Sequence, residues 1–93
     1  MPRKAGMAFM IEFVEEYLRG DMDRMGFDLD FNHYLIKHYP RMERENSELA
    51  ECFAFYLGED GLDRTVGLSD AEHKALIRDK FDDFLSVIRD GLY

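Results

Sequence analysis

The spacing of apolar and polar residues along the chain predicts helices and no strands. Between Met7 and Leu18 the apolar side chains recur three or four positions apart, as they do on one face of a helix, and acidic residues occupy the other side. We expect Gly20 to end this helix, because glycine readily adopts the left-handed conformation that follows a helix C-terminus. No segment shows sustained alternation of apolar and polar positions, so we predict no strand.

The middle of the chain predicts two further helices, separated by Pro40. The second helix is expected to run from about Asp28 to His38, since Phe31 lies among apolar residues at helical spacing. Pro40 should end it, because a proline pushes the preceding residue out of the helical region. The third helix has an expected N-cap at Asn46 or Ser47 and an expected end at Gly58. Its apolar face consists of Leu49, Cys52, Phe53, Tyr56 and Leu57. Residues 58–67, with three glycines and three acids, are predicted to form a loop.

The last helix carries the clearest start signal. Ser69 and Glu72 have the spacing of a capping box, in which each side chain accepts a hydrogen bond from the other residue's backbone N–H. Gly91 is expected to close this helix. We predict an all-α fold, a compact bundle of about four helices with short loops. Its core should include these residues of the last two helices: Phe53, Phe81, Phe84 and Ile88.

The length of 93 residues indicates one domain, because a second would have too little chain to bury a core. We assign residues 1–6 to a flexible basic tail and residues 7–93 to a single helical domain. The single cysteine, Cys52, cannot form an internal disulfide, and the N-terminal apolar run leads into Glu15 and Glu16 rather than a cleavage site. These features predict a cytoplasmic protein.

Charge narrows the range of partners. The chain has 20 Asp and Glu against 12 Lys and Arg, a net charge of −8. This balance disfavours direct binding to nucleic acid or to an anionic membrane and leaves a basic protein partner open. The excess is concentrated in residues 7–32, with seven acids and two bases, and in residues 58–72, with five acids and one base. We expect these partner-binding residues: Asp21, Asp23, Asp28, Asp30, Glu59, Asp60 and Asp63.

The aspartates of residues 20–32 also invite comparison with a calcium-binding loop. With Asp21 at position 1, a calcium loop needs an oxygen ligand at position 5 and a bidentate Glu at position 12. This sequence places Met25 and Asn32 there, and Asp28 stands at position 8, where an apolar residue is expected. We therefore predict no calcium site. We interpret Asp28 and Asp30 as residues of the first turn of a helix, where the positive helix end stabilises their carboxylates.

Other chemistry has little support. Cys52 lies on the apolar face of its helix, where a free cysteine is typically a small core residue. His33 and His38 are five residues apart, which is not a same-face spacing, and His73 is remote in sequence. We therefore expect no enzyme, no metal site and no cofactor.

Helix-boundary signals give one family resemblance. The stretch "FVEEYLRGDM", the aromatic residues that follow it, "FYLGEDG" and the helix start "LSDAEHKALI" resemble the small helical immunity proteins related to the colicin D immunity protein. A Ser or Thr expected shortly after Gly20 is replaced by Asp23. The resemblance implies a protein that neutralises a basic nuclease toxin, with carboxylates in the place of RNA phosphates.

Three hypotheses follow from the sequence. The first is an acidic inhibitor of a nucleic-acid-handling enzyme, either a toxin-immunity protein or a phage-type inhibitor. The second is a structural or regulatory helical module, which could be a homodimer. The third is a small enzyme or metal-binding protein, which the missing motifs disfavour. We take the first as the working hypothesis.

Overall fold

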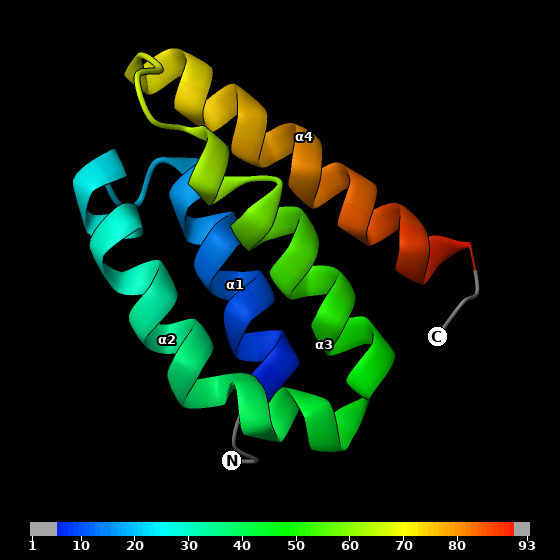
Figure 1. Cartoon of the computed structure of the whole chain (residues 1–93). Coiled ribbons are helices and arrows are strands. Elements are labelled where there is room, and N and C mark those ends of the chain that lie inside the picture. The colour runs from blue at the N-terminus through cyan, green and yellow to red at the C-terminus, as the bar shows by residue number, and fades with distance from the viewer. Residues whose placement is uncertain (1–5, 91–93) are drawn as a thin grey trace.

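The computed structural model describes residues 6–90 as a helical bundle (Figure 1). Its elements are, in chain order, α1 (Gly6–Arg19), α2 (Arg24–Glu45), α3 (Ser47–Phe53), the π-helical turn η1 (Ala54–Glu59), the 3-10 turn η2 (Leu62–Arg64) and α4 (Asp70–Arg89). The first three helices lie side by side, and α4 packs on η1 and against the sides of α1 and α2. The described range contains no strand, so the predicted all-α fold is confirmed.

The local signals for helix ends are confirmed where the structure describes them. Gly20 follows α1 with a φ of 92°, in the left-handed region that glycine adopts without strain. Asn46 caps α3, since its side-chain oxygen accepts a hydrogen bond from the N–H of Leu49 at 3.0 Å. Ser69 and Glu72 form the complete capping box at the start of α4. The expected end of that helix, Gly91, lies outside the described residues.

α2 is longer than the sequence predicted at both ends. It begins at Arg24, with Asp23 as its N-cap, rather than at Asp28. It also passes through Pro40 and continues to Glu45, so the prediction that Pro40 ends the helix is wrong. Pro40 is exposed, so water can reach the helix where the proline provides no backbone N–H. The α2 ribbon changes direction in this part of the chain (Figure 1), as expected at a proline kink.

The last turn of α2 holds the start of α1. The Glu45 carboxylate accepts hydrogen bonds from the N–H groups of Gly6 at 2.7 Å and Met7 at 3.1 Å, two donors that α1 itself cannot satisfy. A Cβ at Gly6 would lie 3.2 Å from the His38 carbonyl oxygen, so glycine lets the two helices approach closely. Gly6 therefore belongs to α1 and not to the predicted tail, whose residues 1–5 lie outside the described range.

The predicted loop at residues 58–67 is partly helical. Gly58 does not end α3 but lies within η1, where the N–H of Asp60 donates to the carbonyl of Phe55, five residues earlier, at 2.8 Å. That spacing defines a π-helix. The 3-10 turn η2 follows shortly after it. The chain therefore stays compact between α3 and α4 instead of forming an open loop.

Aromatic rings join the helices through the core. Phe27 and Phe31 of α2 lie 5.4 Å apart between centroids, Phe31 lies 6.2 Å from Phe53 of α3, and Phe53 lies 5.1 Å from Phe84 of α4. All four rings are fully buried. Of the core residues predicted from the last two helices, Phe53, Phe81 and Phe84 are buried, whereas Ile88 is only partly covered.

Replacing Phe84 with Ala should lower the free energy of unfolding by about 3–5 kcal/mol, because the substitution leaves a cavity in a packed core. Denaturant titration measures this change. The control is Val66→Ala, at a side chain that is 89% exposed, and it should change stability by less than about 0.5 kcal/mol. Equal effects of the two substitutions would contradict the assigned core.

Candidate partner-binding surface

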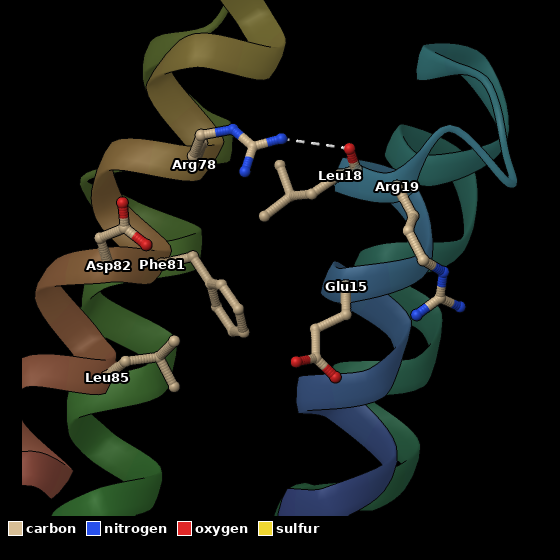
Figure 2. Close-up of a pocket in the computed structure, with 7 residues that line it drawn as sticks. All are labelled: Glu15, Leu18, Arg19, Arg78, Phe81, Asp82 and Leu85. Atoms are coloured by element: carbon tan, nitrogen blue, oxygen red, sulfur yellow. Dashed lines mark hydrogen bonds between the residues drawn. The ribbon is translucent and has the colours of Figure 1, made fainter.

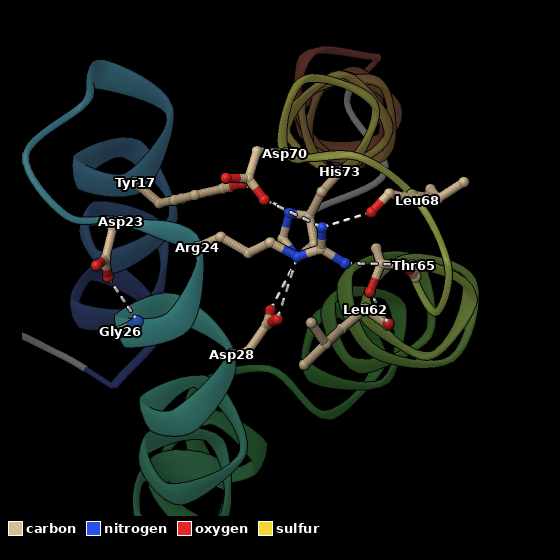
Figure 3. Close-up of polar contacts among 10 residues, drawn as sticks. All are labelled: Tyr17, Asp23, Arg24, Gly26, Asp28, Leu62, Thr65, Leu68, Asp70 and His73. Carbon is tan, nitrogen blue, oxygen red and sulfur yellow. Dashed lines mark hydrogen bonds and ion pairs between the residues drawn. The ribbon is translucent and has the colours of Figure 1, made fainter.

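A buried histidine joins three helices. The imidazole of His73 on α4 is fully buried, with its Nδ1 2.6 Å from the Tyr17 hydroxyl of α1 and its Nε2 2.8 Å from Oδ1 of Asp28 on α2 (Figure 3). A carboxylate only accepts hydrogen bonds, so Nε2–H donates to Asp28. In the tautomer whose single proton is on Nε2, Nδ1 accepts from the Tyr17 hydroxyl. We call Tyr17, His73 and Asp28 the His73 network.

Arg24 extends this network to the segment before α4. Its guanidinium donates to the Leu68 carbonyl at 2.5 Å and the Thr65 carbonyl at 3.0 Å, and it lies 3.3 Å from Asp70 (Figure 3). Its Nε also lies 3.7 Å from Oδ2 of Asp28. The start of α2 and residues 65–70 are therefore held together, so the two acid-rich parts of the sequence adjoin at this point.

Tyr17 and His73 of this network are buried, whereas the Asp28 side chain is 36% exposed. Burial raises the pKa of the Tyr17 hydroxyl above its ordinary value, and the nearby Asp28 and Asp70 carboxylates add to this increase while Arg24 opposes it. The hydroxyl therefore stays protonated at neutral pH and can serve as the donor to His73. Within residues 6–90 no buried side-chain nitrogen or oxygen lacks a hydrogen-bond partner. Tyr17 and His73 thus form a satisfied buried joint, and Asp28 is the member of the network that reaches the surface.

Four of the seven expected partner-binding residues already have partners within the fold. Asp21 pairs with Arg19 at 2.9 Å, and Asp23 accepts from the N–H of Gly26 at 2.8 Å. Asp28 belongs to the His73 network. Asp60 lies 2.6 Å from the Lys80 ammonium and 2.9 Å from the Arg64 guanidinium, and these hydrogen bonds lower its pKa.

These positions correct one expectation. Asp28 and Asp30 do not lie in the first turn of α2, because the helix begins at Arg24 and its N-cap is Asp23. As the N-cap, the Asp23 carboxylate contributes about 0.5–2 kcal/mol to helix stability. Reversing the charge of Asp23 would therefore disturb the fold as well as the surface.

The other three expected residues are free to meet a partner. Asp30 lies on α2, Glu59 ends η1 and Asp63 lies in η2, and all three are exposed. None of them forms an ion pair with another residue in the described part of the chain. They are the expected residues whose charge is available to a partner at no cost to the fold.

The N-terminal parts of α2 and α4 enclose a shallow depression of about 440 Å³. We call it the Arg24 depression, after its one basic residue, and its lining is as follows: Asp23, Arg24, Met25, Asp28, Leu29 and Asp70. The carboxylates of Asp28 and Asp70 lie 3.7 and 3.3 Å from the guanidinium, and Asp23 adds a third acid to the lining. Asp70 was not among the expected residues, although it directly follows the N-cap Ser69. Arg24 and His73 were not expected either, because their partners are distant in sequence.

The geometry around the aspartates is not that of a metal site. Residues 24–32 are helical, so they do not form the looped backbone that surrounds a calcium ion. Among residues 6–90 no three side chains of the His, Cys, Asp and Glu types lie close enough together to hold a metal ion. Cys52 is half-buried beside the core, and His38 stacks near Phe9 with centroids 4.2 Å apart.

A second depression, of about 370 Å³, lies between α1 and α4 (Figure 2). Leu18, Phe81 and Leu85 supply its apolar lining, and the Arg78 guanidinium spans its end to the Leu18 carbonyl at 3.2 Å. Its charged lining is balanced, with two acids and two arginines: Glu15, Asp82, Arg19 and Arg78. It therefore selects for neither sign of charge, unlike the Arg24 depression.

Comparisons of the chain with protein-family models, with curated proteins and with solved structures find no match. Along residues 6–90, no helix has both the length and the apolar character needed to cross a membrane. The candidate surface therefore rests on the geometry and charge of this chain alone.

Tyr17→Phe should lower the free energy of unfolding by about 1–3 kcal/mol, because it leaves the Nδ1 atom of a buried imidazole without its donor. Tyr56→Phe is the matched control, since Tyr56 is half-buried and has no hydroxyl hydrogen bond within the described range. Thermal or urea unfolding of both variants measures the difference. If Tyr17→Phe is no more harmful than the control, the His73 network does not stabilise the fold.

Proposed function

We propose that this chain is a non-catalytic binding protein that inhibits a basic, nucleic-acid-handling enzyme by presenting carboxylates in place of phosphates. The observation that carries the proposal is the Arg24 depression, which is lined by three acids, Asp23, Asp28 and Asp70, and by one basic residue. A basic side chain of a partner would find an excess of negative charge there. This is the kind of action that the resemblance to nuclease immunity proteins implies.

The exposed acids outside the depression support the same proposal. Asp30, Glu59 and Asp63 have no cationic partner among residues 6–90, so their field extends into solvent. A net charge of −8 on 93 residues would steer a basic partner toward the chain. Phosphate mimicry needs only carboxylates at the surface, and it requires no reaction on this chain.

The burial of Tyr17 and His73 supports a non-catalytic role. A Tyr–His–Asp chain can move protons when its ends reach a substrate, but the side chains of Tyr17 and His73 are buried. The network instead fixes Asp28 and, through Arg24, places Asp70 beside it. Its contribution to binding is thus to hold carboxylates in position.

The proposed test reverses charge at three acids that the fold does not use. The triple variant Asp30→Lys, Glu59→Lys and Asp63→Lys should weaken binding about 10–100-fold, because each substitution replaces attraction with repulsion. Circular dichroism should show an unchanged fold, since exposed charges contribute little to stability. The matched control reverses three exposed acids of α4, Asp79, Asp82 and Asp83, and should weaken binding much less.

The assay uses the tagged chain to capture its partner, which is then purified and tested for cleavage of labelled RNA and DNA. The chain should inhibit that cleavage. Its association rate should fall steeply between about 0.1 M and about 1 M salt, as the Debye length shrinks from about 10 Å to about 3 Å. Association that is indifferent to salt, or greater damage from the α4 control set, would overturn the proposal.

A further inference from the structure

The outer face of α2 exposes an apolar stripe. Met25, Leu29 and Ile36 are 70%, 71% and 75% exposed, and they are three of the five large hydrophobic residues that are exposed in the described range. Their spacings of four and seven residues place them on one side of the helix, away from the buried Phe27 and Phe31. Apolar side chains gathered on one exposed face indicate an interaction surface, whereas single scattered ones do not.

Charge along α2 changes sign halfway. Residues 23–32 contain three aspartates and one arginine, whereas residues 33–44 contain three Lys or Arg residues and one Glu. Four of these charges recur every seven residues along one flank of the stripe, in the order negative, negative, positive, positive: Asp23, Asp30, Lys37 and Arg44. All four are exposed. In the described range, Asp30, Lys37 and Arg44 form no ion pair.

The charge pattern of one α2 complements the pattern of a second α2 that runs in the opposite direction. A second copy of α2, packed antiparallel across a two-fold axis near residues 32 and 33, would bring Leu29 opposite Ile36 and Asp30 near Lys37. A two-fold interface repeats each contact, so one complementary pair counts twice. In a parallel two-fold arrangement, the same flanks of the two helices would lie on opposite sides of the contact, so Asp30 of one copy would not meet Lys37 of the other. The charges therefore favour the antiparallel arrangement.

We propose that the outer face of α2 binds a second copy of this chain in an antiparallel homodimer. The stripe from Met25 to Ile36 spans about 17 Å of helix, all of it before the bend at Pro40, which suffices for a short continuous contact. Three apolar anchors per chain form a small interface compared with the roughly 1,200–2,000 Å² typical of stable complexes, so a dissociation constant of micromolar order is expected. This inference does not rest on the proposed function, because it needs no other partner.

Dimerisation and the proposed function would compete for part of the same helix. Asp23 and Asp30 belong to both surfaces, and Met25 and Leu29 line the Arg24 depression. A basic partner that binds there would displace the second copy. The dimer is nevertheless tested on the isolated chain, so failure of one proposal leaves the other standing.

Sedimentation velocity of the purified chain, from about 1 µM to about 1 mM, should show a shift from monomer to dimer mass. Ile36→Glu should remain monomeric throughout, with an unchanged helical circular-dichroism spectrum because Ile36 is exposed. The matched control is Val66→Glu, which places the same charge at an exposed apolar residue outside α2 and should dimerise as the wild type does. A wild type that stays monomeric at about 1 mM, or an Ile36→Glu variant that still dimerises, would overturn the proposal.

Charge swaps test the orientation. Asp30→Lys alone and Lys37→Asp alone should each raise the dimer dissociation constant about tenfold, because each places like charges together twice. An equimolar mixture of the two variants should associate again, since every contact between unlike chains is then attractive. If Asp30→Lys leaves dimerisation unchanged, or if the mixture does not recover, the antiparallel arrangement is wrong.

Discussion

The arrangement of the helices depends on the burial of one imidazole. A buried polar group without partners costs free energy, so His73 requires a donor and an acceptor that come from outside its own helix. Tyr17 and Asp28 supply them, and this places α1 and the first half of α2 against α4. Arg24 then fixes residues 65–70 beside the same turn of α2. The position of the acidic surface is therefore a consequence of satisfying a buried histidine.

Sequence reasoning succeeded where the physical cause is local. Gly20, Asn46 and Ser69 mark helix ends through contacts within a few residues, and all three act as predicted. The His73 network could not be found in this way, because its partners are 56 and 45 residues away along the chain. The prediction for Pro40 failed for a similar reason: the helix continues beyond it because its last turns bury a methionine and cap the start of α1.

The difference between local and long-range contacts also applies to the acids of the candidate site. Composition indicated an acidic surface, and the sequence located the segments that contain most of the excess charge. It could not separate carboxylates that hold the fold, such as Asp28 and Asp60, from exposed ones such as Asp30 and Asp63, because that depends on which donor or cation lies nearby in space. α2 contributes to both proposed binding surfaces. It lines the acidic depression at its N-terminal end and carries the exposed apolar stripe along its outer face.

The protonation pattern of His73 tests the central claim most directly. Long-range proton–nitrogen correlation spectra at neutral pH, with Tyr17→Phe for assignment, report which ring nitrogen carries the proton. The hydrogen bonds predict a proton on Nε2 that is protected from solvent exchange, and an Nδ1 resonance that is perturbed in the variant. A proton on Nδ1 alone, or rapid solvent exchange of the Nε2 proton, would contradict a network in which Tyr17 donates to His73 and His73 donates to Asp28.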